Sequence, residues 1–137
     1  MAVILEQVSH PSEQDELDLK KIYADFPLHE GQPFSLNKAR GDIYAGRMND
    51  QLLGAFEVAD KGSHVVLIYL CVRKEHRHRH VARDMLRQFL KGLTVDCHLM
   101  EPKGIDSQQA LHRLLSQLGF KQVEESWVYK VKNTTND

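Results

Sequence analysis

One uninterrupted apolar run, HVVLIYLCV at residues 64–72, constrains the fold of this chain more than any other segment. The run is rich in β-branched residues, which favour strands, and a turn sequence, DKGS at 60–63, precedes it. A strand without polar alternation has to be covered on both faces. We therefore expect a central β-strand over 64–72 with packed layers on either side.

The segments around this run predict further strands and helices. Ser12 and Ser107 are suitable helix N-caps, and Gly92 and Gly119 suit helix ends. The sequence NDQ at 49–51 predicts a tight hairpin tip. Strand-like runs occupy 2–8, 42–48, 52–59, 64–72, 94–100 and 126–131, and apolar residues at helical spacing fall in 13–26, 81–91 and 108–118.

These elements follow the order β-α-β-β-β-α-β-α-β, which predicts an α/β fold with a mixed sheet flanked by helices. We expect a single domain over 1–131, followed by a polar tail at 132–137. The apolar stripe of the first helix is expected to include Phe26.

Composition narrows the classes of function. Hydrophobic residues make up 42% and charged residues 27% of the 137 residues, and the net charge of −1 gives no global attraction to nucleic acid or membranes. The apolar run at 2–5 is too short for a signal peptide or a membrane span, so we expect a cytoplasmic protein. Cys71 and Cys97 lack C-x-x-C spacing and are expected to be reduced core thiols.

Basic side chains concentrate between the central strand and the start of the following helix. The first N–H groups of a helix lack intrahelical partners, and its positive dipole end attracts anions. Arginine side chains there add charge-assisted donors. The arrangement predicts a cradle for a phosphorylated ligand such as a pyrophosphate. The basic residues of 73–87 are Arg73, Lys74, Arg77, Arg79, Arg83 and Arg87, against Glu75 and Asp84.

The same segment leaves three alternatives open. His76, His78 and His80 alternate, which suits a histidine-rich metal-binding module, but the interleaved arginines repel a cation and no carboxylate or cysteine completes a shell, so no metal site is predicted. A nucleic-acid patch lacks supporting aromatic residues. A solvated basic loop without a ligand is the third alternative.

The motif Arg77-His78-Arg79-His80-Val81-Ala82 is similar to the R/Q-x-x-G-x-G/A acetyl-coenzyme A motif of the GNAT N-acetyltransferase superfamily. With four further segments the chain resembles a narrower family, the GNAT-like maturation and regulatory factors of aspartate decarboxylase (PanM/PanZ). The resemblance spans most of 13–129. The quoted segments are EQDELDLKKIY, IYAGRMNDQLLGAFEV, LCVRKEHRHRHVARDML, LHRLLSQLGF and SWVY.

The resemblance implies a GNAT-like fold with acetyl-CoA or CoA as cofactor. It also implies a partner, aspartate 1-decarboxylase (PanD), whose maturation to the pyruvoyl form such proteins promote while regulating pantothenate and coenzyme A biosynthesis. The motif glycine is replaced by His80, which is costly if the position needs a positive φ. By position, pantetheine contacts fall on Leu70, Cys71 and Val72, and the phosphate loop on His76, Arg77, His78, Arg79, His80, Val81, Ala82 and Arg83.

An acetyltransferase acting on a small amine or a protein N-terminus remains the main alternative. Such an enzyme needs a base and an acid, for which Glu57 and Tyr129 are the candidates. A strand glutamate on the solvent face and a packed tyrosine with a wet hydroxyl are the commoner situations, so no convincing catalytic pair is predicted. For partner binding, the exposed hairpin tip suggests Arg47 and Asn49.

Overall fold

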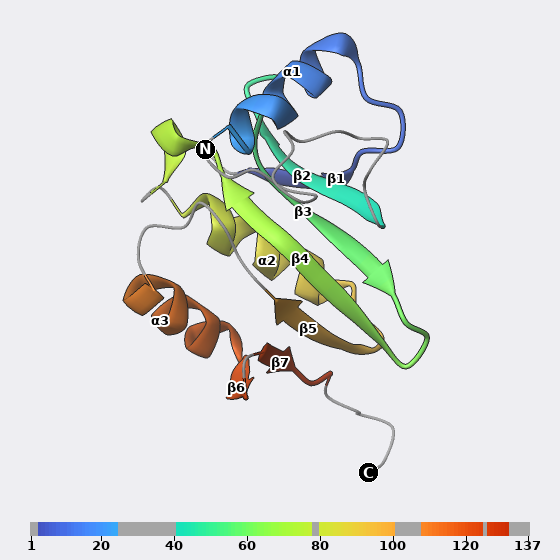
Figure 1. Ribbon diagram of the computed structural model, residues 1–137, viewed down its shortest axis with the longest axis vertical. Helices are drawn as coiled ribbons and strands as arrows, with labels where there is room; N and C mark the ends of the chain where they lie inside the picture. The colour runs from blue at the N-terminus through green and yellow to red at the C-terminus, as the bar shows by residue number, and fades with distance from the viewer. Residues whose placement is uncertain (1–2, 25–40, 78–79, 101–107, 125, 132–137) are drawn as a thin grey trace.

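The computed structural model describes residues 3–24, 41–77, 80–100, 108–124 and 126–131. It contains a seven-stranded mixed sheet in the order β1-β2-β3-β4-β5-β7-β6, in which only β4 and β5 pair in parallel (Figure 1). The strands are β1 (Ile4–Gln7), β2 (Asp42–Met48), β3 (Gln51–Asp60), β4 (His64–Val72), β5 (Asp96–Met100), β6 (Lys121–Val123) and β7 (Ser126–Tyr129). The helices are α1 (Glu13–Ile22), α2 (Val81–Lys91) and α3 (Gln108–Leu118), with a 3-10 turn, η2, at Lys74–His76.

The predicted element order is confirmed, with β6 as an added short strand. β4 is the central strand that the apolar run predicts, with the same bounds, between β3 and β5. The sheet separates two apolar cores. Residues of α2 and α3 pack in the larger core on one face, and residues of α1 pack in the smaller core on the other. Figure 1 shows α2 running behind β4.

The start of α1 has the predicted cap. Ser12 Oγ accepts a hydrogen bond from the Asp15 N–H at 3.0 Å, and the Asp15 carboxylate accepts one from the Ser12 N–H at 3.2 Å. This reciprocal capping box satisfies two N–H groups that the helix leaves without partners. Leu19 and Ile22 then bury the apolar side of the helix, while the predicted contributions of Phe26 and of the Ser107 cap lie outside the described residues.

The β2–β3 connection lies in the tight hairpin tip predicted at 49–51, but it is a two-residue turn, because Gln51 already belongs to β3. Asn49 and Asp50 have φ values of 51° and 65°, the left-handed pair that a tight turn of the I′ kind requires. Asparagine and aspartate tolerate this conformation better than most residues. The turn therefore presents the Asn49 side chain at an exposed, well-defined tip.

A β-bulge interrupts β4 at Tyr69, whose φ is 58°. Ala55 pairs with Cys71 but Glu57 pairs with Ile68, so two residues of β4 face one residue of β3. The extra residue switches which side chains point to which core. Val65 and Leu67 before the bulge, and Leu70 and Val72 after it, all pack in the larger core.

The outer edge of β1 is closed by a side chain from α2. The Leu5 N–H donates to Gln88 Oε1 at 2.8 Å, and Gln88 Nε2 donates to the Val3 carbonyl at 2.6 Å. The amide of Gln88 thus makes the two bonds that another strand would make at this point. It also ties α2 to the β1 edge of the sheet.

Candidate functional site

The peptide groups at the end of β4 alternate between its two neighbouring strands. The Arg73 N–H donates to the Leu53 carbonyl of β3 at 2.8 Å, so the groups of residues 71 and 73 face β3 and those of Leu70 and Val72 face the β5 side. Among the described residues, β4–β5 pairing ends at Ile68 opposite Met100. Within the described part of the chain, the strand therefore presents an edge of peptide groups at Leu70 and Val72, where the Val72 carbonyl also accepts a hydrogen bond from Arg77 Nε.

Side chains at this edge are fully packed inside the protein. Leu70 and Cys71 are 0% exposed and Val72 is 3% exposed. Any ligand lying along the edge would meet peptide groups there instead of these side chains. The expectation that Cys71 and Cys97 are buried free thiols is confirmed. Burial raises the pKa of Cys97 to about 12.

A short basic turn follows the edge and folds back on it. Arg73, the residue just before η2, forms an ion pair from its Nε to Glu75 Oε2 at 2.9 Å. Arg77 Nε donates to the Val72 carbonyl at 2.8 Å, so part of its guanidinium secures the turn to the end of β4. His78 and Arg79, predicted for the phosphate loop, lie outside the described residues.

His80 occupies the position of the motif glycine and has a left-handed backbone, with φ 63° and ψ 17°. It is the N-cap residue of α2, its ring is exposed, and its side chain makes no capping hydrogen bond. A left-handed conformation costs an L-residue about 1–2 kcal/mol, although histidine adopts it more often than most. The requirement for a positive φ, which explains a glycine preference, is therefore present here.

The start of α2 lies directly after this residue. The first intrahelical bond runs from the Asp84 N–H to the His80 carbonyl at 3.0 Å, which places the N–H groups of Val81, Ala82 and Arg83 ahead of it without intrahelical partners. The Val81 and Ala82 side chains are buried, so these residues could contribute to an anion site only through their N–H groups. Arg83 is half-buried, and its Nε lies 3.8 Å from Asp84 Oδ1.

Two classes of site receive no support from the part of the chain with described coordinates. It contains no group of three or more His, Cys, Asp or Glu side chains that could hold a metal ion. None of its helices has the length and apolar character needed to cross a membrane.

The two candidate catalytic residues lie on opposite faces of the sheet. Glu57 is 0% exposed, so the expectation of a solvent-facing glutamate is wrong: it pairs with Ile43, on the face that α1 covers. Tyr129 is half-buried and packs against Phe120 in the larger core, at a ring distance of 5.6 Å. The geometry does not bring the two side chains together.

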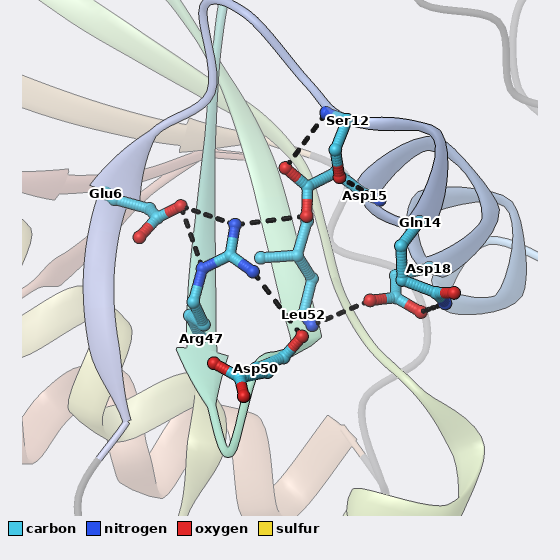
Figure 2. A network of polar contacts seen from close by, with 8 residues as sticks. All are labelled: Glu6, Ser12, Gln14, Asp15, Asp18, Arg47, Asp50 and Leu52. Carbon is cyan, nitrogen blue, oxygen red and sulfur yellow. Dashed lines mark hydrogen bonds and ion pairs between the residues drawn. The ribbon is translucent and has the colours of Figure 1, made fainter.

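At the hairpin tip, Arg47 is held in an internal network (Figure 2). Its Nη2 lies 2.8 Å from Glu6 Oε1 and 3.1 Å from Asp15 Oδ1, and its Nε donates to Glu6 Oε1 at 3.1 Å. The hydrogen bond to Glu6 raises the pKa of Arg47. Asp15 has its pKa lowered, because hydrogen bonds from Ser12 and Arg47 outweigh the opposing effect of burial.

Asp18 extends the same network to the next strand. Its carboxylate accepts hydrogen bonds from the buried Leu52 N–H at 3.1 Å and from Gln14 Nε2 at 2.9 Å (Figure 2). The network joins α1 to both sides of the β2–β3 turn. It therefore fixes the tip, while Asn49 remains exposed at its end.

Solved structures define the class of this fold. The chain is similar to the coenzyme A-bound solution structure of YhhK from Escherichia coli, with a TM-score of 0.75, 26% identity, and coverage of 96% of this chain and 100% of that one. The E. coli ribosomal-protein-S18-alanine N-acetyltransferase is similar in fold, with a TM-score of 0.72, 12% identity, and coverage of 98% and 97%. The protein has a GNAT fold.

Residues 2–128 match the family described as "Acetyltransferase (GNAT) domain, PanZ", and the chain belongs to this family. Two curated relatives are both named "PanD regulatory factor". That of E. coli K12 is 31% identical over 118 residues, covering 85% of this chain and 89% of the relative. That of Salmonella typhimurium is 28% identical over 128 residues, covering 93% and 98%. The expected family is thus confirmed.

Proposed function

We propose that this protein binds coenzyme A or acetyl-coenzyme A and, as a coenzyme-bearing partner, regulates the maturation of aspartate 1-decarboxylase. The name of its curated relatives, PanD regulatory factor, supports the partner. The coenzyme A bound to the similar YhhK structure supports the ligand.

The observation that carries the ligand proposal is the sequence of structures from β4 to α2. The β4 edge offers the peptide groups of Leu70 and the N–H of Val72 to the amide-bearing pantetheine arm, while the Val72 carbonyl accepts from Arg77. A basic turn and the first N–H groups of α2 follow Val72 directly in the chain and suit the phosphates. A single ligand with amides at one end and phosphates at the other matches this order of donors.

The partner surface is proposed at the β2–β3 tip. Asn49 projects from a rigid turn and can both donate and accept hydrogen bonds. Arg47 supports this tip from within, because its guanidinium is engaged by Glu6 and Asp15. We assign Asn49 to direct contact and Arg47 to holding the contact surface in shape.

Acetyl transfer is not part of the proposal. The candidate base Glu57 and the candidate acid Tyr129 pack in different cores on opposite faces of the sheet. In this proposal the acetyl-coenzyme A is a ligand that reports the coenzyme pool.

Two measurements test the proposal separately. Coenzyme A at about 100 times its dissociation constant should stabilise the protein by about 2.7 kcal/mol, measured by thermal unfolding. Purified aspartate decarboxylase precursor should cleave faster with this protein and acetyl-coenzyme A than with either alone. An unchanged melting temperature would refute coenzyme binding, and an unchanged cleavage rate would refute the role in decarboxylase maturation. Consumption of acetyl-coenzyme A on a defined amine would favour the transferase.

A further inference from the structure

Two hydrogen bonds connect the C-terminal end of α1 to the bulge in β4. The Tyr23 hydroxyl donates to the Tyr69 carbonyl at 2.9 Å. In the opposite direction, from β4 to α1, the Cys71 thiol donates to the Ile22 carbonyl at 3.2 Å. The bonds join segments 46 and 49 residues apart and attach on either side of Leu70, so we call them the bulge clasp.

The bulge clasp stabilises two features that are unfavourable by themselves, a helix-end carbonyl and a left-handed backbone. The Ile22 carbonyl is at the end of α1, and the last carbonyls of a helix need donors from outside it. Tyr69 has a left-handed backbone that a non-glycine residue keeps only when its surroundings enforce it. The bulge clasp supplies that enforcement from the helix that covers this face.

Tyr23 is well suited to a permanent donor role. Tyr23 is 2% exposed, so bulk water does not compete for the hydrogen bond that its hydroxyl donates. Burial, with the nearby Cys71 and Glu57, raises the pKa of Tyr23 well above its usual value. The hydroxyl therefore keeps its proton at every pH at which the protein would work.

The bulge decides where the peptide groups of β4 point. Without the extra residue at Tyr69, residues 70 and 72 would exchange faces and peptide directions with Cys71. With it, the groups of Leu70 and Val72 turn away from β3, toward the edge beyond Ile68. Any contact that stabilises the bulge therefore also fixes the direction of the peptide groups at that edge.

We propose that Tyr23 and Cys71 are positioning residues, which hold the bulge so that the Leu70 and Val72 peptide groups meet the pantetheine arm of the coenzyme. This inference rests on the proposed coenzyme binding. Both side chains act from behind the strand, because they are buried on the α1 face and do not reach the ligand edge.

The test uses Tyr23→Phe, which removes one hydroxyl and keeps the ring. Calorimetry should show coenzyme A binding weakened about 5- to 10-fold, the effect expected for one lost hydrogen bond. Binding of 3′,5′-ADP, which has the phosphates but no pantetheine, should change less than about twofold. Tyr44→Phe is the matched control, since Tyr44 is a half-buried tyrosine packed on Phe56 and Phe89 in the other core, and it should bind both ligands normally.

A second readout reports the strand directly. In ligand-free protein, Tyr23→Phe should shift the NMR amide resonances of Leu70 and Val72, and Tyr44→Phe should leave them in place. Cys71→Ala should weaken coenzyme A more than Cys71→Ser, which keeps a donor.

The outcomes separate this inference from the proposed function. If wild-type protein binds coenzyme A and Tyr23→Phe binds it equally well, the inference fails alone. Equal losses for coenzyme A and 3′,5′-ADP would also overturn it, because they indicate a general loss of structure. If wild-type protein binds no coenzyme A, the proposed function fails, and this inference fails with it.

Discussion

Replacing His80 by glycine should stabilise the protein, although it removes a whole side chain. At φ 63° the Cβ of His80 strains the backbone, and glycine has no Cβ. Relief of about 1–2 kcal/mol is opposed by the greater chain entropy of glycine in the unfolded state, about 0.5–1 kcal/mol. The ring is exposed and makes no capping bond, so little else is lost. We expect a net gain of about 0.5–1 kcal/mol.

Urea unfolding of wild type, His80→Gly and His80→Ala measures this gain. In a separate thermal unfolding experiment, the melting temperature of the glycine variant should be roughly 2–4 °C higher than that of wild type. His80→Ala is the matched control: it removes the ring but keeps the Cβ, so it should be no more stable than wild type. Coenzyme A should bind His80→Gly at least as tightly as wild type, because glycine lets the backbone approach a phosphate. An equal gain for both variants, or a less stable glycine variant, would refute the argument from backbone strain.

Three further changes test the hairpin tip and the core. Asn49→Gly keeps the φ of 51° accessible, so it should weaken association with the decarboxylase in calorimetry while leaving the melting temperature within about 1–2 °C; Asn49→Ala would add strain and confuse the two effects. Arg47→Met should lower the free energy of unfolding by about 1–2 kcal/mol in urea, because Glu6 and Asp15 lose their cation; a loss below about 0.3 kcal/mol would contradict this role. The raised pKa of Cys97 contributes stability below pH 9 that is lost between pH 9 and about 12, because the unfolded thiol releases its proton first. Unfolding free energy should fall there by up to about 1.4 kcal/mol per pH unit, and Cys97→Val should make the slope shallower.

Local signals were sufficient to predict much of the framework. The apolar run predicts β4 with its bounds, Ser12 predicts the start of α1, and NDQ at 49–51 predicts the tight hairpin tip that contains the Asn49–Asp50 turn. The family resemblance adds the glycine preference of the motif, which indicates a conformational demand at His80, and His80 has the left-handed backbone that this demand implies. The predictions of β4, of the start of α1 and of the hairpin tip depend on interactions between neighbours in the chain.

What the sequence did not predict depends on contacts between distant segments. The bulge at Tyr69 is invisible in a uniformly apolar run, because a change of phase leaves no polar residue on the wrong face. The burial of Glu57 results from α1 covering its face of the sheet, which strand alternation does not indicate. The three residues of β6 are all exposed and carry no periodic pattern, so this strand exists through pairing with β7.

The Gln88 amide has a consequence for the behaviour of the protein at high concentration. An uncovered strand edge is a template on which a second molecule can extend the sheet. Here the β1 edge is already bonded at Val3 and Leu5, and the opposite edge, β6, is only three residues long and begins with Lys121. Native molecules should therefore resist edge-to-edge association at both ends of the sheet, and aggregation should require prior unfolding.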